Sequence, residues 1–158
     1  MSISTADLCD QYGDKVLVLD LPLRSYGGVN SFEGEVVTIH LDEDNSDLVT
    51  LLRDVEGKGR VVVVDVDGKF CAVAGDTLMG YAQKNGWAGI VINGYVRDTM
   101  LTQTMPVGLF ALGTCPRKST KQASSTQNES VSFGGITIKA GNYIYADDDG
   151  VVLLVSKL

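Results

Sequence analysis

The apolar positions of this chain follow two periods, and each period predicts a different kind of element. Residues 32–41 alternate well enough to predict a strand, with Gly34 as a candidate bulge. Residues 61–64 are four consecutive valines, which predict a strand buried on both faces. Between residues 77 and 85, Leu78, Tyr81 and Ala82 share one helical face, which predicts a helix that ends at Gly86.

The rest of the chain continues this mixture of helices and strands. A helix is expected over residues 4–13 with Thr5 as its cap, and another is expected to begin at Asn45 or Ser46. Residues 116–130 are expected to form a solvated loop, with ordering at a subunit interface as the alternative. Residues 16–21 and 70–74 are short apolar segments, and further strands are expected over residues 88–92, 106–112, 131–133, 136–139, 143–146 and 151–155. This order of elements indicates an α/β fold, and we expect one domain over residues 1–158.

Composition and charge narrow the class of protein. The chain has 158 residues with 44% hydrophobic and 21% charged side chains, an ordinary globular balance. No apolar run approaches the ~20 residues needed to cross a bilayer, and no signal peptide is visible, so we expect a cytoplasmic protein with no membrane partner. The net charge of −7 argues against direct nucleic-acid binding, although an acidic surface could meet a basic protein partner.

Cysteines, histidine and acidic runs offer little further chemistry. The three cysteines are widely spaced, which argues against a disulfide framework or a cysteine-ligated zinc site and favours core thiols at Cys71 and Cys115. The single histidine, His40, is expected to be an ordinary strand residue. Residues 147–150 lack the spacing and closing glutamate of an EF-hand loop, so a tight turn is expected there.

Candidate chemistry concentrates between Gly75 and Asp98. The predicted helix there begins at Gly75–Leu78, where free backbone N–H groups could hold a substrate carboxylate, although Asp76 could equally be the helix cap. Arg97 and Asp98 follow the predicted strand at 88–92; Asp98 suits Mg²⁺ or Mn²⁺, and Arg97 suits a carboxylate or an oxyanion. The alternative is a surface ion pair in a loop. A strand–helix–strand crossover would bring both loops to one sheet edge, so Asp76, Arg97 and Asp98 are expected to meet.

At this point the residues resemble a known family. The chain is similar to the RraA-like proteins, which include the class II 4-hydroxy-4-methyl-2-oxoglutarate aldolases and the regulator of ribonuclease activity A. The likeness covers nearly the whole chain. It rests on Leu8-Cys9-Asp10, Tyr26-Gly27-Gly28, Phe32-x-Gly34, Asp44-Asn45, Gly59-Arg60-Val61, Gly75-Asp76, the run from Gly86 through Gly89 and Gly94 to Arg97-Asp98, Phe133-Gly134-Gly135, and Tyr145-Ala146-Asp147 followed by Gly150-Val151.

The resemblance implies a swivelling β/β/α sandwich assembled as a ring-shaped homotrimer, or as a hexamer made of two trimers. It implies that the backbone of Gly75, Asp76, Thr77 and Leu78 binds substrate, together with Arg97. It makes Asp98 the ligand of a divalent metal cation and gives Asp76 the role of orienting a water, so that Asp76 and Arg97 are the catalytic side chains. The site would lie between subunits.

The activity implied by the aldolases is a metal-dependent lyase reaction on a small 2-oxo acid. Retro-aldol cleavage of 4-hydroxy-4-methyl-2-oxoglutarate would give two pyruvates, and oxaloacetate decarboxylation would pass through the same pyruvate enolate. The rival hypothesis is a non-catalytic regulator that binds and inhibits ribonuclease E. The resemblance implies that regulators lose the acidic residue after the arginine, and this chain has Asp98, which favours the enzyme.

Overall fold

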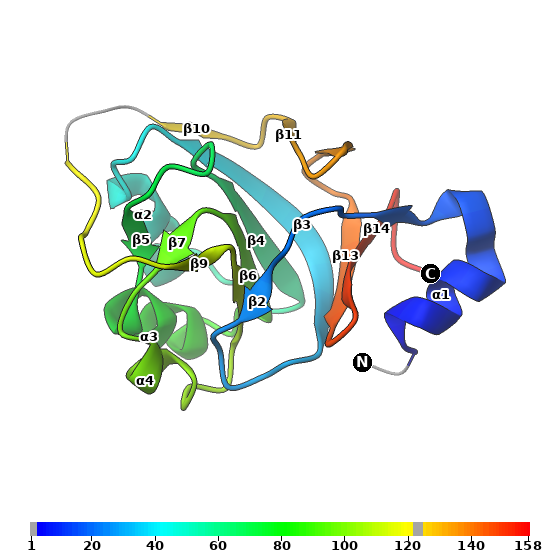
Figure 1. Cartoon of the computed structure of the whole chain (residues 1–158), viewed down its shortest axis with the longest axis horizontal. Helices are drawn as coiled ribbons and strands as arrows, with labels where there is room; N and C mark the ends of the chain where they lie inside the picture. The colour runs from blue at the N-terminus through cyan, green and yellow to red at the C-terminus, as the bar shows by residue number, and fades with distance from the viewer. Residues whose placement is uncertain (1–2, 122–124) are drawn as a thin grey trace.

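A mixed sheet runs through the centre of the molecule (Figure 1). The computed structural model describes residues 3–121 and 125–158. Within them the large sheet has the order β1-β14-β13-β3-β4-β6-β8-β2. Its strands are β1 (Leu17–Val18), β2 (Arg24–Ser25), β3 (Phe32–Leu41), β4 (Arg60–Asp65), β6 (Gly89–Asn93), β8 (Gly108–Ala111), β13 (Tyr143–Asp147) and β14 (Gly150–Leu154).

Strand β3 is long enough to have different neighbours along its length. β13 pairs with its first residues, from Phe32 to Glu35, whereas β10 (Ser125–Gln127) pairs with its last, from Ile39 to Leu41. On the other side β3, β4, β6 and β8 are parallel. The prediction that residues 116–130 form only a solvated loop is therefore wrong, because β10 extends the large sheet. Residues 122–124 of that segment lie outside the described residues.

The valines of β4 pack into two separate cores. Val62 and Val64 contact the apolar side chains of the helical layer, while Val61 and Val63 contact Phe32, Phe110 and the C-terminal strands. All four valines are fully buried, which confirms the prediction of a strand covered on both faces. Burying each such side chain stabilises the fold by about 1.5–3 kcal/mol.

Helices and a second sheet cover one side of the large sheet (Figure 1). This side holds the α2, α3 and α4 helices, and α1 lies at the opposite end, beside β13 and β14 (Figure 1). The second sheet has the order β5-β7-β9, and β11 and β12 form a separate hairpin. These elements are α1 (Thr5–Tyr12), η1 (Gly13–Lys15), α2 (Ser46–Asp54), α3 (Asp76–Lys84), α4 (Thr99–Thr102), β5 (Ala72–Ala74), β7 (Tyr95–Val96), β9 (Gly113–Thr114), β11 (Val131–Phe133) and β12 (Ile136–Ile138). The layers confirm the predicted α/β fold class and its β/β/α arrangement.

One predicted helix cap differs from the observed one, and a second is at a predicted residue but makes no side-chain capping bond. Ser4, not Thr5, caps α1, because the Ser4 hydroxyl accepts a hydrogen bond from the Asp7 N–H at 3.1 Å. Thr5 instead donates its hydroxyl to Asp147 at 2.7 Å and so ties α1 to the end of β13. Asn45 is the N-cap residue of α2, but its side chain donates to the Val73 carbonyl at 2.7 Å. That bond joins the start of α2 to β5.

Other predictions hold. The Gly134-Gly135 pair turns the β11–β12 hairpin, and residues 147–150 turn β13 into β14. Cys9, Cys71 and Cys115 are free thiols, and the last two are buried as expected. A search of the described residues for helices long and apolar enough to span a membrane finds none.

Candidate active site

The second sheet, β5-β7-β9, brings Gly75 and Arg97 together. β5 and β7 are parallel neighbours, with Ala74 paired to Val96, so the chain leaves both strands at the same edge. The Arg97 N–H donates to the Ala74 carbonyl at 3.0 Å, which fixes the two exits relative to each other. We expected the strand at residues 88–92 to make this pairing, but that strand is β6 of the large sheet. The residues meet as predicted, through the two-residue strand β7 instead.

Helix α3 presents its first turn to this edge. Gly75 is the N-cap residue and Asp76 is already helical, so the alternative that Asp76 caps the helix is wrong. No side chain of the described residues caps α3, and its first N–H groups are therefore available to a ligand. These amides carry the positive end of the helix dipole and favour an anion such as a carboxylate.

Asp98 lies against the backbone of Gly75. A Cβ atom added to Gly75 would stand 2.6 Å from the Asp98 Oδ2 atom, so only glycine leaves room for the carboxylate here. Asp98 is held in the left-handed backbone region at φ 59°, and its carbonyl accepts hydrogen bonds from the N–H groups of Leu101 and Thr102 in α4. The carboxylate is thereby placed beside the first turn of α3.

Arg97 and Asp98 form a loose pair. Their Nε and Oδ2 atoms are 3.9 Å apart, and the two side chains are 40% and 42% exposed. Arg97 also reaches the Pro116 carbonyl, with an Nη1–O distance of 3.4 Å. Because an exposed ion pair at this distance contributes little to stability, both side chains remain available to a ligand. The hypothesis of a mere surface ion pair also leaves unexplained why Asp98 is packed against the start of α3.

A cavity of about 260 Å³ joins these groups. Its lining includes the predicted site residues Gly75, Asp76, Thr77, Leu78, Arg97 and Asp98. The sequence did not predict Asn45, Lys118, Ser119 and Lys121, which are the other polar side chains of the wall. The basic residues of the 116–130 segment could have indicated that it lines an anion site. The polar composition of the segment predicted a solvated loop instead. Lys121 donates to the Asn45 side chain, so this segment is anchored to the start of α2.

The residues around Asp98 fit a hard divalent cation. Mg²⁺ binds through one or two carboxylates and fills its remaining positions with waters and substrate oxygens. Asp98 supplies one carboxylate on the cavity wall, and its side chain is 42% exposed. Asp76 lines the same cavity and offers a second acidic group.

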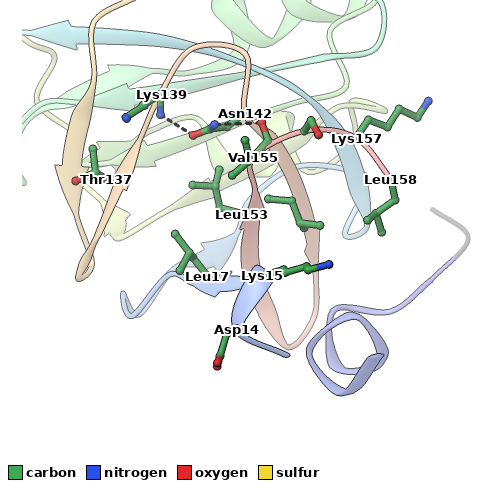
Figure 2. Close-up of a pocket in the computed structure, with 12 residues that line it drawn as sticks. Asp14, Lys15, Leu17, Thr137, Lys139, Asn142, Leu153, Val155, Lys157 and Leu158 are labelled. Carbon is green, nitrogen blue, oxygen red and sulfur yellow. Dashed lines mark hydrogen bonds between the residues drawn. The ribbon is translucent and has the colours of Figure 1, made fainter. Parts of the chain in front are cut away.

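Two other features lie apart from this cavity. His40, Asp65 and Asp67 place their ligand atoms within 4.8 Å of one another, and His40 Nε2 is 2.9 Å from Asp67 Oδ2. A cavity of about 610 Å³ lies between β1, β14 and the hairpin (Figure 2). Leucines and the three lysines Lys15, Lys139 and Lys157 line it, and Asn142 bridges the Lys139 N–H and the Val155 carbonyl. Its size exceeds that of the Asp98 cavity, but among its lining residues Asp14 is the one with a carboxylate side chain.

Comparison with known proteins assigns the family. The RraA-like family, described as Aldolase/RraA, matches residues 5–153, and the chain belongs to it. A protein of Alkalilimnicola ehrlichii is 44% identical over 159 residues, covering 100% of this chain and 98% of the relative. It is named as a candidate 4-hydroxy-4-methyl-2-oxoglutarate aldolase, and so is a relative from Aromatoleum aromaticum that is 43% identical and covers 100% of this chain and 99% of its own.

Solved structures share the fold under different names. A Geobacillus kaustophilus protein described as an S-adenosylmethionine:2-dimethylmenaquinone methyltransferase superposes with a TM-score of 0.95 at 41% identity, covering 99% of this chain and 97% of its own. The RNA-processing inhibitor RraA from Thermus thermophilis superposes with a TM-score of 0.94 at 35% identity, covering 100% and 96%. One fold thus carries three named activities, and the site must decide between them.

Proposed function

We propose that the protein is a divalent-metal-dependent aldolase that cleaves 4-hydroxy-4-methyl-2-oxoglutarate into two molecules of pyruvate, with oxaloacetate decarboxylation as a second activity. The observation that carries the proposal is the placement of the Asp98 carboxylate against Gly75, between the first turn of α3 and Arg97. One cavity therefore offers an anion site, a cation ligand and a guanidinium that is available to a ligand. The names of the relatives at 43% and 44% identity support the same reaction.

In the proposed mechanism the N–H groups at the start of α3 bind the carboxylate beside the substrate's keto group. Cleavage breaks the bond between C3 and C4, and its electron pair moves through C2 to the keto oxygen, giving the enolate of the first pyruvate. The hydroxyl carbon becomes the keto carbon of the second pyruvate. Arg97 would donate to the enolate oxygen, where electrostatic stabilisation lowers the barrier most.

Asp98 would hold the divalent ion, with Asp76 beside it. When bound, Mg²⁺ or Mn²⁺ supplies Lewis-acid stabilisation of negative charge on the substrate oxygens. The Asp76 carboxylate orients a water that accepts the proton of the substrate's 4-hydroxyl. That proton is returned to C3, which completes the methyl group of the first pyruvate. In oxaloacetate the leaving group is carbon dioxide, and the same enolate follows.

The cavity volume argues against the activity in the name of the Geobacillus protein, methyl transfer, as the function of this site. Pockets for drug-sized ligands commonly measure ~300–1,000 Å³. The cavity beside Asp98 measures about 260 Å³, which suits a short 2-oxo acid better than an adenosine-containing methyl donor.

The proposal is tested by assaying pyruvate release from oxaloacetate and from 4-hydroxy-4-methyl-2-oxoglutarate, with and without Mg²⁺. We expect activity that chelation with EDTA removes and that Mg²⁺ or Mn²⁺ restores. Asp98→Ala is expected to abolish activity and to destabilise the fold by only about 1–2 kcal/mol, because the side chain is 42% exposed and alanine is merely disfavoured in the left-handed backbone at φ 59°. Full activity in EDTA, or no activity on any 2-oxo acid, would refute the proposal.

We further propose a ring-shaped homotrimer, or a pair of such rings, with the site near a subunit boundary. Large exposed apolar side chains support this arrangement: Met100 and Leu101, which follow Asp98 in α4, are 83% and 51% exposed, and Phe70, which precedes β5, is 69% exposed. Phe70 packs edge-on against Tyr95 with ring centroids 5.0 Å apart, so part of this surface is already ordered. Light scattering should give a mass at least three times the chain mass of 16.9 kDa. A monomer would contradict the arrangement.

The second candidate function is binding and inhibition of ribonuclease E. Its support is the 35% identity to the inhibitor from Thermus thermophilis and the net charge of −7, which could attract a basic segment of a nuclease. Regulation by surface binding would survive Asp98→Ala, whereas catalysis would not. Failure to retain ribonuclease E in a low-salt pull-down would eliminate this candidate.

A further inference from the structure

Three metal-ligating side chains meet at one end of the large sheet, apart from the Asp98 cavity. His40 lies near the end of β3, Asp65 is the last residue of β4, and the two are paired in register. Asp67 follows in the loop after β4. One ring nitrogen of His40 and one carboxylate oxygen each of Asp65 and Asp67 lie within 4.8 Å of one another. Ligands of open α/β sheets commonly bind at this end of parallel strands, outside their carboxyl ends.

Asp65 carries a buried carboxylate whose hydrogen-bond donors are neutral. The residue is 5% exposed, and its Oδ1 atom accepts hydrogen bonds from the Asp67 N–H at 2.9 Å and from the Asn93 side-chain amide at 3.0 Å. None of the ion pairs among the described residues includes Asp65, and Lys69, the nearest basic residue in sequence, pairs with Asp42 instead. Because a buried carboxylate is normally paired with a cation or bound to a metal, Asp65 points to a cation supplied from outside the chain.

The donor set and its spacing fit Zn²⁺. Zinc takes imidazole nitrogen and carboxylate oxygen at about 2.0–2.2 Å, so that the ligand atoms of a tetrahedral site stand about 3.4 Å apart. The His40 Nε2 and Asp67 Oδ2 atoms are already 2.9 Å apart, and the two side chains are 37% and 55% exposed, so both can turn toward an ion held by Asp65. The two hydrogen bonds to Asp65 keep its carboxylate in place. Three protein ligands leave the fourth position of the tetrahedron to water.

We propose that His40, Asp65 and Asp67 form a second metal site, which binds Zn²⁺. The ion neutralises the buried Asp65 carboxylate and joins the end of β3 to the loop after β4. The Asn93 amide, on the neighbouring strand β6, orients Asp65 as the outer hydrogen-bond partner of a metal ligand. None of the three ligands lines the Asp98 cavity, so the inference does not depend on the proposed function.

The single histidine makes the site directly observable. His40 is the only histidine of the chain, so the imidazole NMR signals of protein purified without a histidine tag report on this site alone. We expect one equivalent of Zn²⁺ at about pH 7.5, where an ordinary imidazole is mostly neutral, to replace the free His40 signal by a new one. EDTA should restore the free signal, and an excess of Mg²⁺ of about tenfold should leave it unchanged, because Mg²⁺ prefers oxygen ligands. A His40 signal that does not respond to Zn²⁺ would overturn the site.

Variants of the carboxylates test the other two ligands. Asp67→Asn and Asp65→Asn should each weaken the Zn²⁺ affinity measured at the His40 signal at least about tenfold, because even the outer partners of a metal ligand are worth about 10–100-fold. Asparagine suits position 67, where the backbone is left-handed at φ 55°. Asp42→Asn is the matched control, since it removes one negative charge just after β3 from a side chain that is 61% exposed. It should change the affinity by less than about threefold, because solvent and salt screen an exposed charge.

The variants also separate a three-ligand site from weaker kinds of zinc binding. Unchanged affinity in the carboxylate variants would show that His40 binds zinc alone, and equal weakening by Asp42→Asn would show attraction by general negative charge; either result overturns the site. Zn²⁺ should raise the melting temperature of the wild-type protein more than that of Asp67→Asn, since a ligand of the folded state stabilises it, and an equal rise in both would count against the site. Because the Asp67 side chain is exposed, this variant decides the question even if the buried change Asp65→Asn prevents folding.

Discussion

Gly75→Ala is expected to disable the site without unfolding the protein. The added Cβ would stand 2.6 Å from Asp98 Oδ2, whereas ordinary contacts begin at 3.4 Å, so the carboxylate must retreat by about 0.8 Å. The next nearest atoms, the Arg97 carbonyl oxygen and Cγ, lie at 3.4 Å and 3.5 Å and need not move. Because the Asp98 side chain is 42% exposed, it can turn away into solvent at little cost.

The functional cost of that movement should be large. A displacement of about 1 Å in a catalytic group can slow a reaction on the order of 10²-fold. We therefore expect Gly75→Ala to lower kcat for oxaloacetate by roughly 10²-fold and to weaken Mg²⁺ binding, while the free energy of unfolding in urea changes by less than about 1 kcal/mol. Magnesium titration of the decarboxylase rate, combined with urea unfolding, measures both effects.

Gly80→Ala provides the matched control in the same helix. A Cβ at Gly80 meets nothing within 4 Å, so this change should keep activity and stabilise the protein by about 0.5–1 kcal/mol, the usual gain from replacing a helical glycine. Activity of Gly75→Ala within threefold of wild type would refute the reasoning. A loss of activity explained by global unfolding would refute it too.

The remaining predictions concern the fold and its pH dependence. Gly108→Ala places a Cβ 2.2 Å from the buried ring of Phe32, so urea unfolding should show a loss of about 1–3 kcal/mol that a second change, Phe32→Leu, partly recovers; an unchanged midpoint would contradict this packing. Burial raises the pKa of Asp147, but hydrogen bonds from the backbone and hydroxyl of Thr5 outweigh it and hold the pKa below the ordinary value of 3.8. A carboxyl with a lowered folded-state pKa adds stability above its unfolded pKa and loses it as pH falls through the folded pKa, so the advantage of wild type over Asp147→Asn in melting temperature should shrink below about pH 4. A difference that stays constant from pH 7 to pH 2 would show that the Asp147 charge does not contribute.

Much of this fold could be predicted from the sequence, because its strongest patterns are local. Four consecutive valines can be satisfied only by apolar neighbours on both faces, and the structure gives residues 61–64 two separate cores. The glycine pair at 134–135 predicts a hairpin turn from its own backbone preference. The helical spacing of the apolar residues likewise predicts α3. Such elements need no knowledge of distant partners.

The parts that could not be predicted depend on pairing across the chain. Strand β7 has two residues, too few for a periodic pattern, yet its pairing with β5 assembles the site. Ser119 belongs to a polar segment whose composition indicates a loop, and only its bonds to Ala72 reveal that it is held at the cavity. The sequence also could not predict that the Asn45 side chain points toward Val73 instead of its own helix.

The left-handed backbone at Asp98 allows the residue at this position to change without a change in the fold. At φ 59° the position accepts aspartate, asparagine or glycine with little strain, and it disfavours branched or bulky residues. Exchanging aspartate for asparagine there would remove the charge and leave the chain path intact. If the proposed function holds, a lineage built on this scaffold could therefore gain or lose the proposed metal-dependent catalysis through a single residue, at almost no cost in folding. The scaffold would then remain free to serve as a binding protein.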